Sequence, residues 1–249
     1  MSIVLEICID SVESAIAAQE GGANRVELCD NLLEGGTTPS AGTIALARKH
    51  IGIDLNVIIR PRGGDFFYSD IEFEVMKYDI EQAKALGANG VVIGLLNRDG
   101  TVDVERTAAL VKLARPLSVT FHRAFDMSRD PREALETLIS LGLDRVLTTG
   151  QESSALEGLD LITELVQQAA DRIIIMPGLS SGVSERTVRK IVGQSGVKEV
   201  HTGAGVVVES QMTYRNPRSF MGGELRPPEF ALTSTSARRV SEFVKAVRS

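Results

Sequence analysis

The feature that most constrains the fold of this chain is a regular alternation of short β-rich runs with stretches of helical periodicity. Eight such runs can be distinguished, and the last five recur about every 27 residues. This alternation predicts a parallel sheet with crossover helices, and eight units favour a closed barrel over an open sheet. The sequence therefore predicts an α/β fold of the (β/α)8, or TIM-barrel, type. The runs begin near Ile3, Asn24, Asp54, Gly90, Leu117, Asp144, Arg172 and Glu199.

Helices are expected between and after these runs. Asp10 is the expected N-cap of the first helix, and Pro131 suits the first turn of a later one. No linker interrupts the pattern, so residues 1–249 are expected to form a single domain, with an irregular C-terminal extension over about 204–249. The expected helices cover 11–20, 73–86, 103–114, 131–141, 156–170, 184–192 and 236–247.

Composition and motifs narrow the classes of function. The net charge of −6, without a basic run, argues against a nucleic-acid-binding surface. No apolar stretch approaches the length of a membrane span, and the N-terminus lacks a signal-peptide pattern, so a cytoplasmic location is expected. The sequence has no glycine-rich nucleotide-binding motif, so no organic cofactor is expected. A Schiff-base aldolase is also not expected, because no lysine lies at the C-terminal end of a strand.

Alternate residues of a strand face opposite sides of the sheet. In the first run this places Glu6 and Cys8 in the barrel interior, and in the second Arg25, Glu27 and Cys29. A barrel interior normally contains branched apolar side chains. The large number of polar groups expected there therefore needs an explanation. Later runs add these residues to the same interior: Arg60, Thr120, His122, Glu199 and His201.

Two interpretations of this charged interior stay open. Buried charges persist when they are paired, so the residues could form an internal ion-pair network. They could instead line an active site, which in barrels lies at the C-terminal ends of the strands. An enzyme of this kind would be a lyase, isomerase or hydrolase acting on a small anionic metabolite. Its acid–base candidates are Glu6, Glu27, His122 and His201, and its anion-binding candidates are Arg60, Arg62 and Arg123.

The only two cysteines, Cys8 and Cys29, are expected at similar heights on adjacent strands, which lie about 4.8 Å apart. Two thiolates that close could bind Cu(I), which prefers sulfur. The alternative is that both are buried as small apolar side chains. Glu6 and Glu27 nearby are expected to raise the pKa of both thiols, which disfavours a dithiolate.

Seven segments of the chain form a distinctive set of motifs. They are EIC at 6–8, RVELC at 25–29, EGGTTPS at 34–40, IRPRGGDF at 59–66, YSD at 68–70, TFHRAFDM at 120–127 and RVLT at 145–148. Together these segments resemble the CutC copper-homeostasis family. The resemblance implies a cytoplasmic TIM barrel, often a homodimer or higher homo-oligomer, whose partner is a copper ion. It also implies Cu(I) ligands at Cys8 and Cys29.

Overall fold

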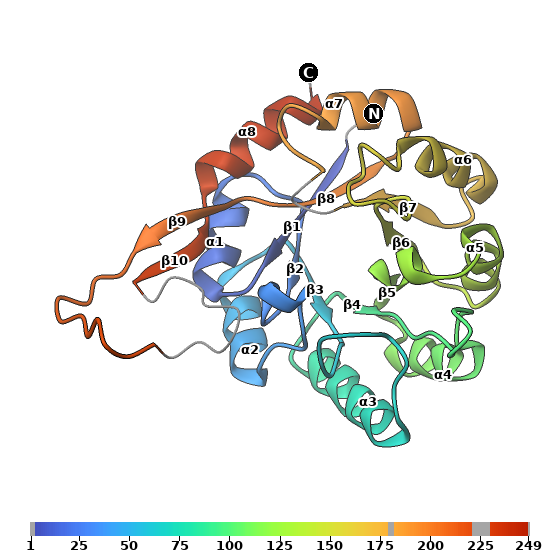
Figure 1. Ribbon diagram of the computed structural model, residues 1–249, viewed down its shortest axis with the longest axis horizontal. Helices are drawn as coiled ribbons and strands as arrows, with labels where there is room; N and C mark the ends of the chain where they lie inside the picture. Colours follow the sequence, from blue (N-terminus) through green and yellow to red (C-terminus); the bar gives the residue numbers. More distant parts are fainter. Residues whose placement is uncertain (1–2, 179–181, 221–229, 249) are drawn as a thin grey trace.

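The computed structural model describes residues 3–178, 182–220 and 230–248. Eight parallel strands lie in one sheet in the order β7-β6-β5-β4-β3-β2-β1-β8, and β8 comes back into contact with β7. The helices surround this nearly closed barrel (Figure 1), which confirms the predicted (β/α)8 fold. The strands are β1 (Val4–Ile9), β2 (Arg25–Leu28), β3 (Asp54–Ile58), β4 (Gly90–Ile93), β5 (Ser118–Phe121), β6 (Arg145–Thr148), β7 (Ile174–Pro177) and β8 (Glu199–Gly203).

The seven expected helices begin within a few residues of the expected positions, and α2 (Ala41–His50) is an additional helix that the expected ranges did not include. The predicted cap of the first helix was wrong by one residue, because the side chain of Ser11 accepts the hydrogen bond from the Ser14 amide. Asp103 and Asp130 cap their helices, and Pro131 begins its helix as expected. The helices are α1 (Val12–Glu20), α2 (Ala41–His50), α3 (Asp70–Ala85), α4 (Val104–Ala114), α5 (Pro131–Ser140), α6 (Leu159–Ala169), α7 (Val188–Ser195) and α8 (Ala237–Arg248), with short 3-10 turns η1 (Leu32–Glu34) and η2 (Arg123–Met127).

The strands divide their side chains between two environments, as alternation requires. Leu5, Ile7 and Ile9 of β1 are fully buried in the large apolar core that packs against the helices. The opposite face is polar at one level and holds a small apolar cluster at another, formed by Cys29, Ile58 and Val92 with Cys8 beside it. Among the described helices, none has the length and apolarity needed to cross a bilayer.

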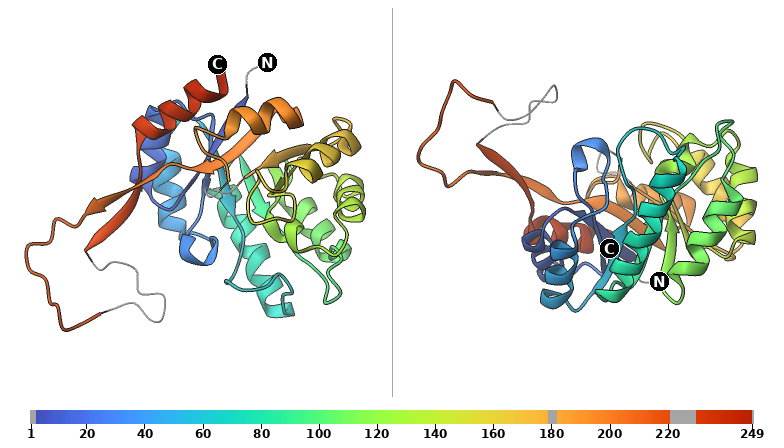
Figure 2. Two further views of the ribbon diagram at one scale, coloured as in Figure 1. Left: turned by 45° about the horizontal axis from the view of Figure 1, so that its top comes forward. Right: turned by 90° about the horizontal axis from the view of Figure 1, so that it is seen from below.

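The C-terminal extension is more regular than expected. Antiparallel strands β9 (Gly205–Glu209) and β10 (Ala231–Thr235) form a hairpin that projects from the barrel (Figures 1 and 2). Helix α8 then returns to pack beside α1 and α7. Its approach is close, since a Cβ atom on Gly21 would lie 2.3 Å from the Cβ atom of Val240. Residues 221–229 of the expected extension lie outside the described residues.

Candidate metal centre and charged barrel interior

The two cysteines lie side by side inside the barrel. The Sγ atoms of Cys8 and Cys29 are 3.8 Å apart, and the Sγ atom of Cys29 is 3.6 Å from a carboxylate oxygen of Glu27. Donor atoms of these three residues all lie within 4.8 Å of one another. Cys29 is buried and Cys8 is half-buried. This is a compact set of potential metal ligands, with two sulfur donors.

Strand register explains how the cysteines meet. Cys8 lies opposite Glu27 in the parallel pairing of β1 with β2, and the amide of Cys29 donates to the carbonyl of Ile9. Cys29 therefore extends the hydrogen-bonded ladder just beyond the end of β2. Both side chains face inward, as the alternation predicted, and the stagger of the barrel brings their sulfurs into contact.

His201 of β8 joins this group from the other side of β1. Its Nδ1 atom lies 2.8 Å from Oε1 of Glu6, its register partner, and its Nε2 atom lies 3.7 Å from Oε2 of Glu27. Burial lowers the pKa of His201, but the Cys8 thiol and the Glu6 and Glu27 carboxyls outweigh this effect and raise it well above its ordinary value. His201 is therefore an imidazolium next to the thiol pair.

The charges around the thiols separate their pKa values. The hydrogen bond with Cys29 and the nearby His201 lower the pKa of Cys8 to about 5, against the opposing effect of burial. The hydrogen bond with Cys8, burial and Glu27 raise the pKa of Cys29. The expectation that both thiol pKa values would be raised was thus wrong for Cys8, because it left out the hydrogen bond between the thiols and His201 on the other neighbouring strand.

Glu6 and Glu27 have opposite ionisation behaviour. Burial raises the pKa of Glu6, but Arg25 and His201 outweigh it and hold that pKa well below its ordinary value. Burial raises the pKa of Glu27 to about 8 in spite of His201, since Glu27 has no arginine partner among the described residues. Glu6 is therefore a carboxylate that fixes its neighbours, while Glu27 is the carboxyl group that faces the thiols.

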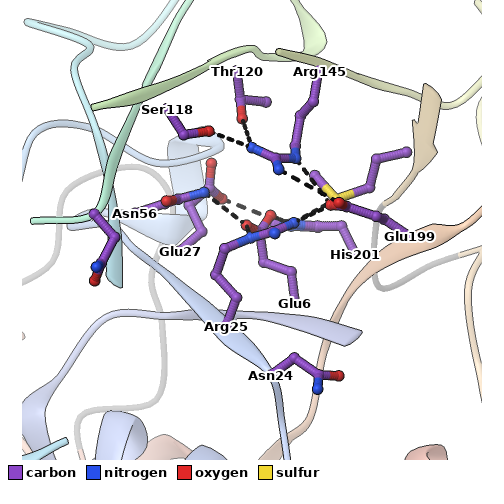
Figure 3. A network of polar contacts seen from close by, with 12 residues as sticks. Glu6, Asn24, Arg25, Glu27, Asn56, Ser118, Thr120, Arg145, Glu199 and His201 are labelled. Carbon is purple, nitrogen blue, oxygen red and sulfur yellow. Dashed lines mark hydrogen bonds and ion pairs between the residues drawn. The ribbon is translucent and has the colours of Figure 1, made fainter. Parts of the chain in front are cut away.

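A layer of buried ion pairs surrounds Glu6 (Figure 3). Arg25 bridges the carboxylates of Glu6 and Glu199, and Arg145 lies 2.9 Å from Glu199. Asn56 donates to Glu6 at 3.1 Å. The expected internal network is therefore present in this layer. Sequence reasoning did not assign Arg145 and Asn56 to it, although the same strand alternation would have placed both inside.

Arg60 and His122 form a second group, at the ends of β3 and β5. Both adjoin the ring of Phe66: the guanidinium carbon of Arg60 and the His122 ring centroid are each 5.1 Å from its centroid. No contact joins His122 to either cysteine in the part of the chain that is described. The acid–base candidates are thus split between two places in the barrel mouth.

The other two predicted anion-binding arginines already have acidic partners. Arg62 lies 2.6 Å from Glu72 and 3.0 Å from Asp65 on an outer loop. Arg123 lies 2.8 Å from Asp126 and donates to Thr149 at 3.1 Å. These contacts brace loops and leave Arg60 as the least compensated of the three.

This chain is similar in sequence to proteins of one known family. The model of the CutC family matches residues 3–206. The chain belongs to the CutC family. It is 52% identical over 237 residues to a copper homeostasis protein cutC homolog of Mus musculus. The matched region covers 95% of this chain and 86% of the relative. A CutC family protein of Parabacteroides distasonis is 50% identical over 245 residues, covering 98% of this chain and 100% of the relative.

Solved structures agree with this CutC assignment. A structure from Streptococcus agalactiae, described as a CutC copper homeostasis protein, is similar with a TM-score of 0.76 and 35% identity, covering 80% of this chain and 98% of the other. A thiamine phosphate pyrophosphorylase from Pyrococcus furiosus has a TM-score of 0.57 at 15% identity, covering 99% of this chain and 96% of the other. The second likeness shows the TIM-barrel fold alone.

Proposed function

We propose that this CutC protein takes part in copper homeostasis by binding Cu(I) through Cys8 and Cys29. The observation that carries the proposal is the 3.8 Å separation of the two sulfurs. A metal–sulfur bond of about 2.3 Å is long enough for one ion to touch both. Thiolates select Cu(I) over harder cations, and the relatives named for copper homeostasis support the role.

His201 and Glu27 are the candidates for a third contact. Imidazole is the better match for Cu(I), because carboxylates suit harder ions. His201 must lose a proton before it can act as a ligand, and Cys29 must lose one as well. Metal binding would therefore release protons. A cytoplasmic location fits this role, since reducing conditions keep paired thiols free for the metal.

The test is an anaerobic Cu(I) titration against a competing chromophoric chelator. The Cys8→Ser/Cys29→Ser variant is expected to lose the tight equivalent that the wild type binds. Met176→Leu is the matched control, because it removes a buried sulfur that contacts Arg25 but leaves both thiols. Equal affinity of the wild type and the double cysteine variant would show that the thiols do not bind copper.

We also propose that two copies associate through the hairpin of β9 and β10. The cross-strand pair Val208 and Leu232 has 44% and 65% of its surface exposed. An isolated two-stranded hairpin is marginally stable in water, and exposed apolar surface of this kind is typical of interaction sites. A second copy would cover this face.

A second candidate function is an enzyme that acts on a small anion. The observation that favours it is the buried guanidinium of Arg60, which donates to backbone carbonyls and has no acidic partner among the described residues. Because Glu6 is held in a buried ion pair, the acid–base candidates for such a reaction are Glu27, His122 and His201.

A further inference from the structure

Arg60 differs from the other arginines inside the barrel. It is 5% exposed, and its two terminal nitrogens donate to the backbone carbonyls of Glu34, Gly36 and Gly64 at 2.7 to 2.9 Å. Within the described residues no carboxylate lies within ion-pair distance of it, and its Nε atom is buried without a hydrogen-bond partner. The backbone contacts hold the guanidinium in place but do not neutralise it. A buried, unpaired positive charge is costly.

His122 presents a second unpartnered donor. Its Nδ1 atom accepts a hydrogen bond from the Ala124 amide at 3.1 Å, so the ring proton is on Nε2. That Nε2 atom is buried and has no partner in the described part of the chain. Burial, with the nearby charges of Arg60 and Arg123, lowers the pKa of His122 to about 3. The ring is therefore neutral and donates through Nε2. Gly94 makes room for it, since a Cβ atom there would lie 2.2 Å from Cε1.

Tyr68 adds a third donor to the same neighbourhood. Its hydroxyl group is buried and makes no hydrogen bond of full geometry among the described residues. Burial raises its pKa to about 12, and Arg60 opposes this rise through its charge and a hydrogen-bonding approach to the hydroxyl, so the two groups adjoin. Four buried side-chain polar atoms in the described residues lack a partner, and three of them belong to Arg60, Tyr68 and His122. The fourth is on Thr107, in α4. Unpartnered buried polar groups are rare in folded proteins, so their concentration around one guanidinium points to a missing acceptor.

We propose that Arg60, Tyr68 and His122 form a binding site for the carboxylate group of a small organic anion, beside Phe66 at the ends of β3 and β5. The net charge of the three groups matches a monoanion, because the tyrosine and the imidazole are neutral donors. A carboxylate supplies two acceptor oxygens and no donor, and it suits the planar guanidinium. This site is independent of copper: it uses neither cysteine.

Histidine NMR provides a direct test, because the chain contains only three histidines, His50, His122 and His201. In reduced, copper-free protein labelled with ¹⁵N-histidine, sodium formate or acetate is added at constant ionic strength against sodium chloride. The His122 Nε2 signal is expected to shift saturably with either carboxylate. The signals of His50 and His201 are expected to stay in place, and the His122→Gln variant identifies the responding signal.

Variants assign the effect to the site. Arg60→Gln is expected to weaken carboxylate binding by about tenfold or more, since it removes a charged donor. Tyr68→Phe removes only the hydroxyl group and is expected to weaken binding by a smaller factor, which keeps the test valid if Arg60→Gln does not fold. Arg132→Gln is the matched control, because it removes one positive charge from an exposed surface pair.

Three outcomes would overturn the proposal. They are the absence of a saturable His122 shift, an equal shift with chloride, and unchanged carboxylate affinity in folded Arg60→Gln and Tyr68→Phe. If inorganic phosphate shifts the signal and the carboxylates do not, the carboxylate assignment is wrong. None of these outcomes depends on copper, so they leave the role of Cys8 and Cys29 to its own test.

Discussion

The Nδ1 atom of His201 lies 2.8 Å from Oε1 of Glu6, its register partner on the adjacent strand. This contact joins the two levels of the barrel interior. On one side Glu6 is fixed by Arg25 and Asn56, and on the other His201 faces the thiols. The ion-pair layer therefore orients a charged ring that, together with the hydrogen bond from Cys29, lowers the pKa of Cys8.

Replacing His201 should make Cys8 less reactive. In His201→Gln the imidazolium is lost but the hydrogen bond with Cys29, the largest cause of the lowered pKa, remains, so the pKa of Cys8 is expected to rise above about 5. Once that pKa exceeds the pH of the assay, the thiolate fraction falls about tenfold for each further unit. Alkylation of Cys8 by iodoacetamide near pH 6, followed by mass spectrometry, measures this change. His50→Gln, at the end of α2, is the control and should alkylate at the wild-type rate.

Breaking the buried pair of Arg145 with Glu199 should strongly destabilise the fold. Arg145→Met leaves part of the charge on Glu199 uncompensated, although Arg25 still contacts it. Loss of one partner of a buried pair costs about 3–5 kcal/mol. Urea denaturation measures the change in the free energy of unfolding. Arg132→Met, which removes an exposed partner of Glu164, should cost no more than about 1 kcal/mol. Similar costs for the two variants would mean that the inner pair is no stronger than a surface pair.

His122 should make the protein less stable in mild acid. Its pKa is lowered from 6.5 to about 3 in the folded protein, so the unfolded chain binds the extra proton first. Stability is therefore lost as the pH falls from about 6.5 towards 3, and this residue alone accounts for about 2 kcal/mol between pH 7 and pH 5. His122→Gln should lose about that much less over the same interval in urea denaturation. A pH dependence identical to that of the wild type would contradict a buried, neutral His122.

Removing the apolar face of the hairpin should weaken self-association. Val208→Thr/Leu232→Thr keeps residues that favour strands but replaces an exposed cross-strand apolar pair. Light scattering coupled to size-exclusion chromatography should show a shift towards the monomer, with little change in the melting of the barrel. Val207→Thr, on the opposite face of β9, is the control. A wild-type protein that is already monomeric would rule out association through this hairpin.

Local patterns were sufficient for the fold and for much of the candidate site. Strand alternation placed Glu6, Glu27 and His201 inside the barrel, and the structure has all three there. It also brought Cys8 and Cys29 together. The same pattern was right about the raised pKa of Cys29 but wrong about that of Cys8, because it considered the carboxylates and left out the hydrogen bond between the two thiols and the histidine on β8. It missed the role of Arg145 because no local signal shows which acid an inward arginine will meet.

The sequence alone thus determined which side chains of each strand face inward, because side-chain direction in a strand repeats every two residues whatever the neighbouring strands are. Partner choice was settled only once the barrel closed. Arg25 and Arg145 meet carboxylates across the sheet, whereas Arg60 meets backbone carbonyls of two loops. These outcomes depend on strand register, barrel stagger and loop conformation, which join residues far apart in the chain. Three arginines that alternation treats alike therefore have different electrostatic roles in the folded protein.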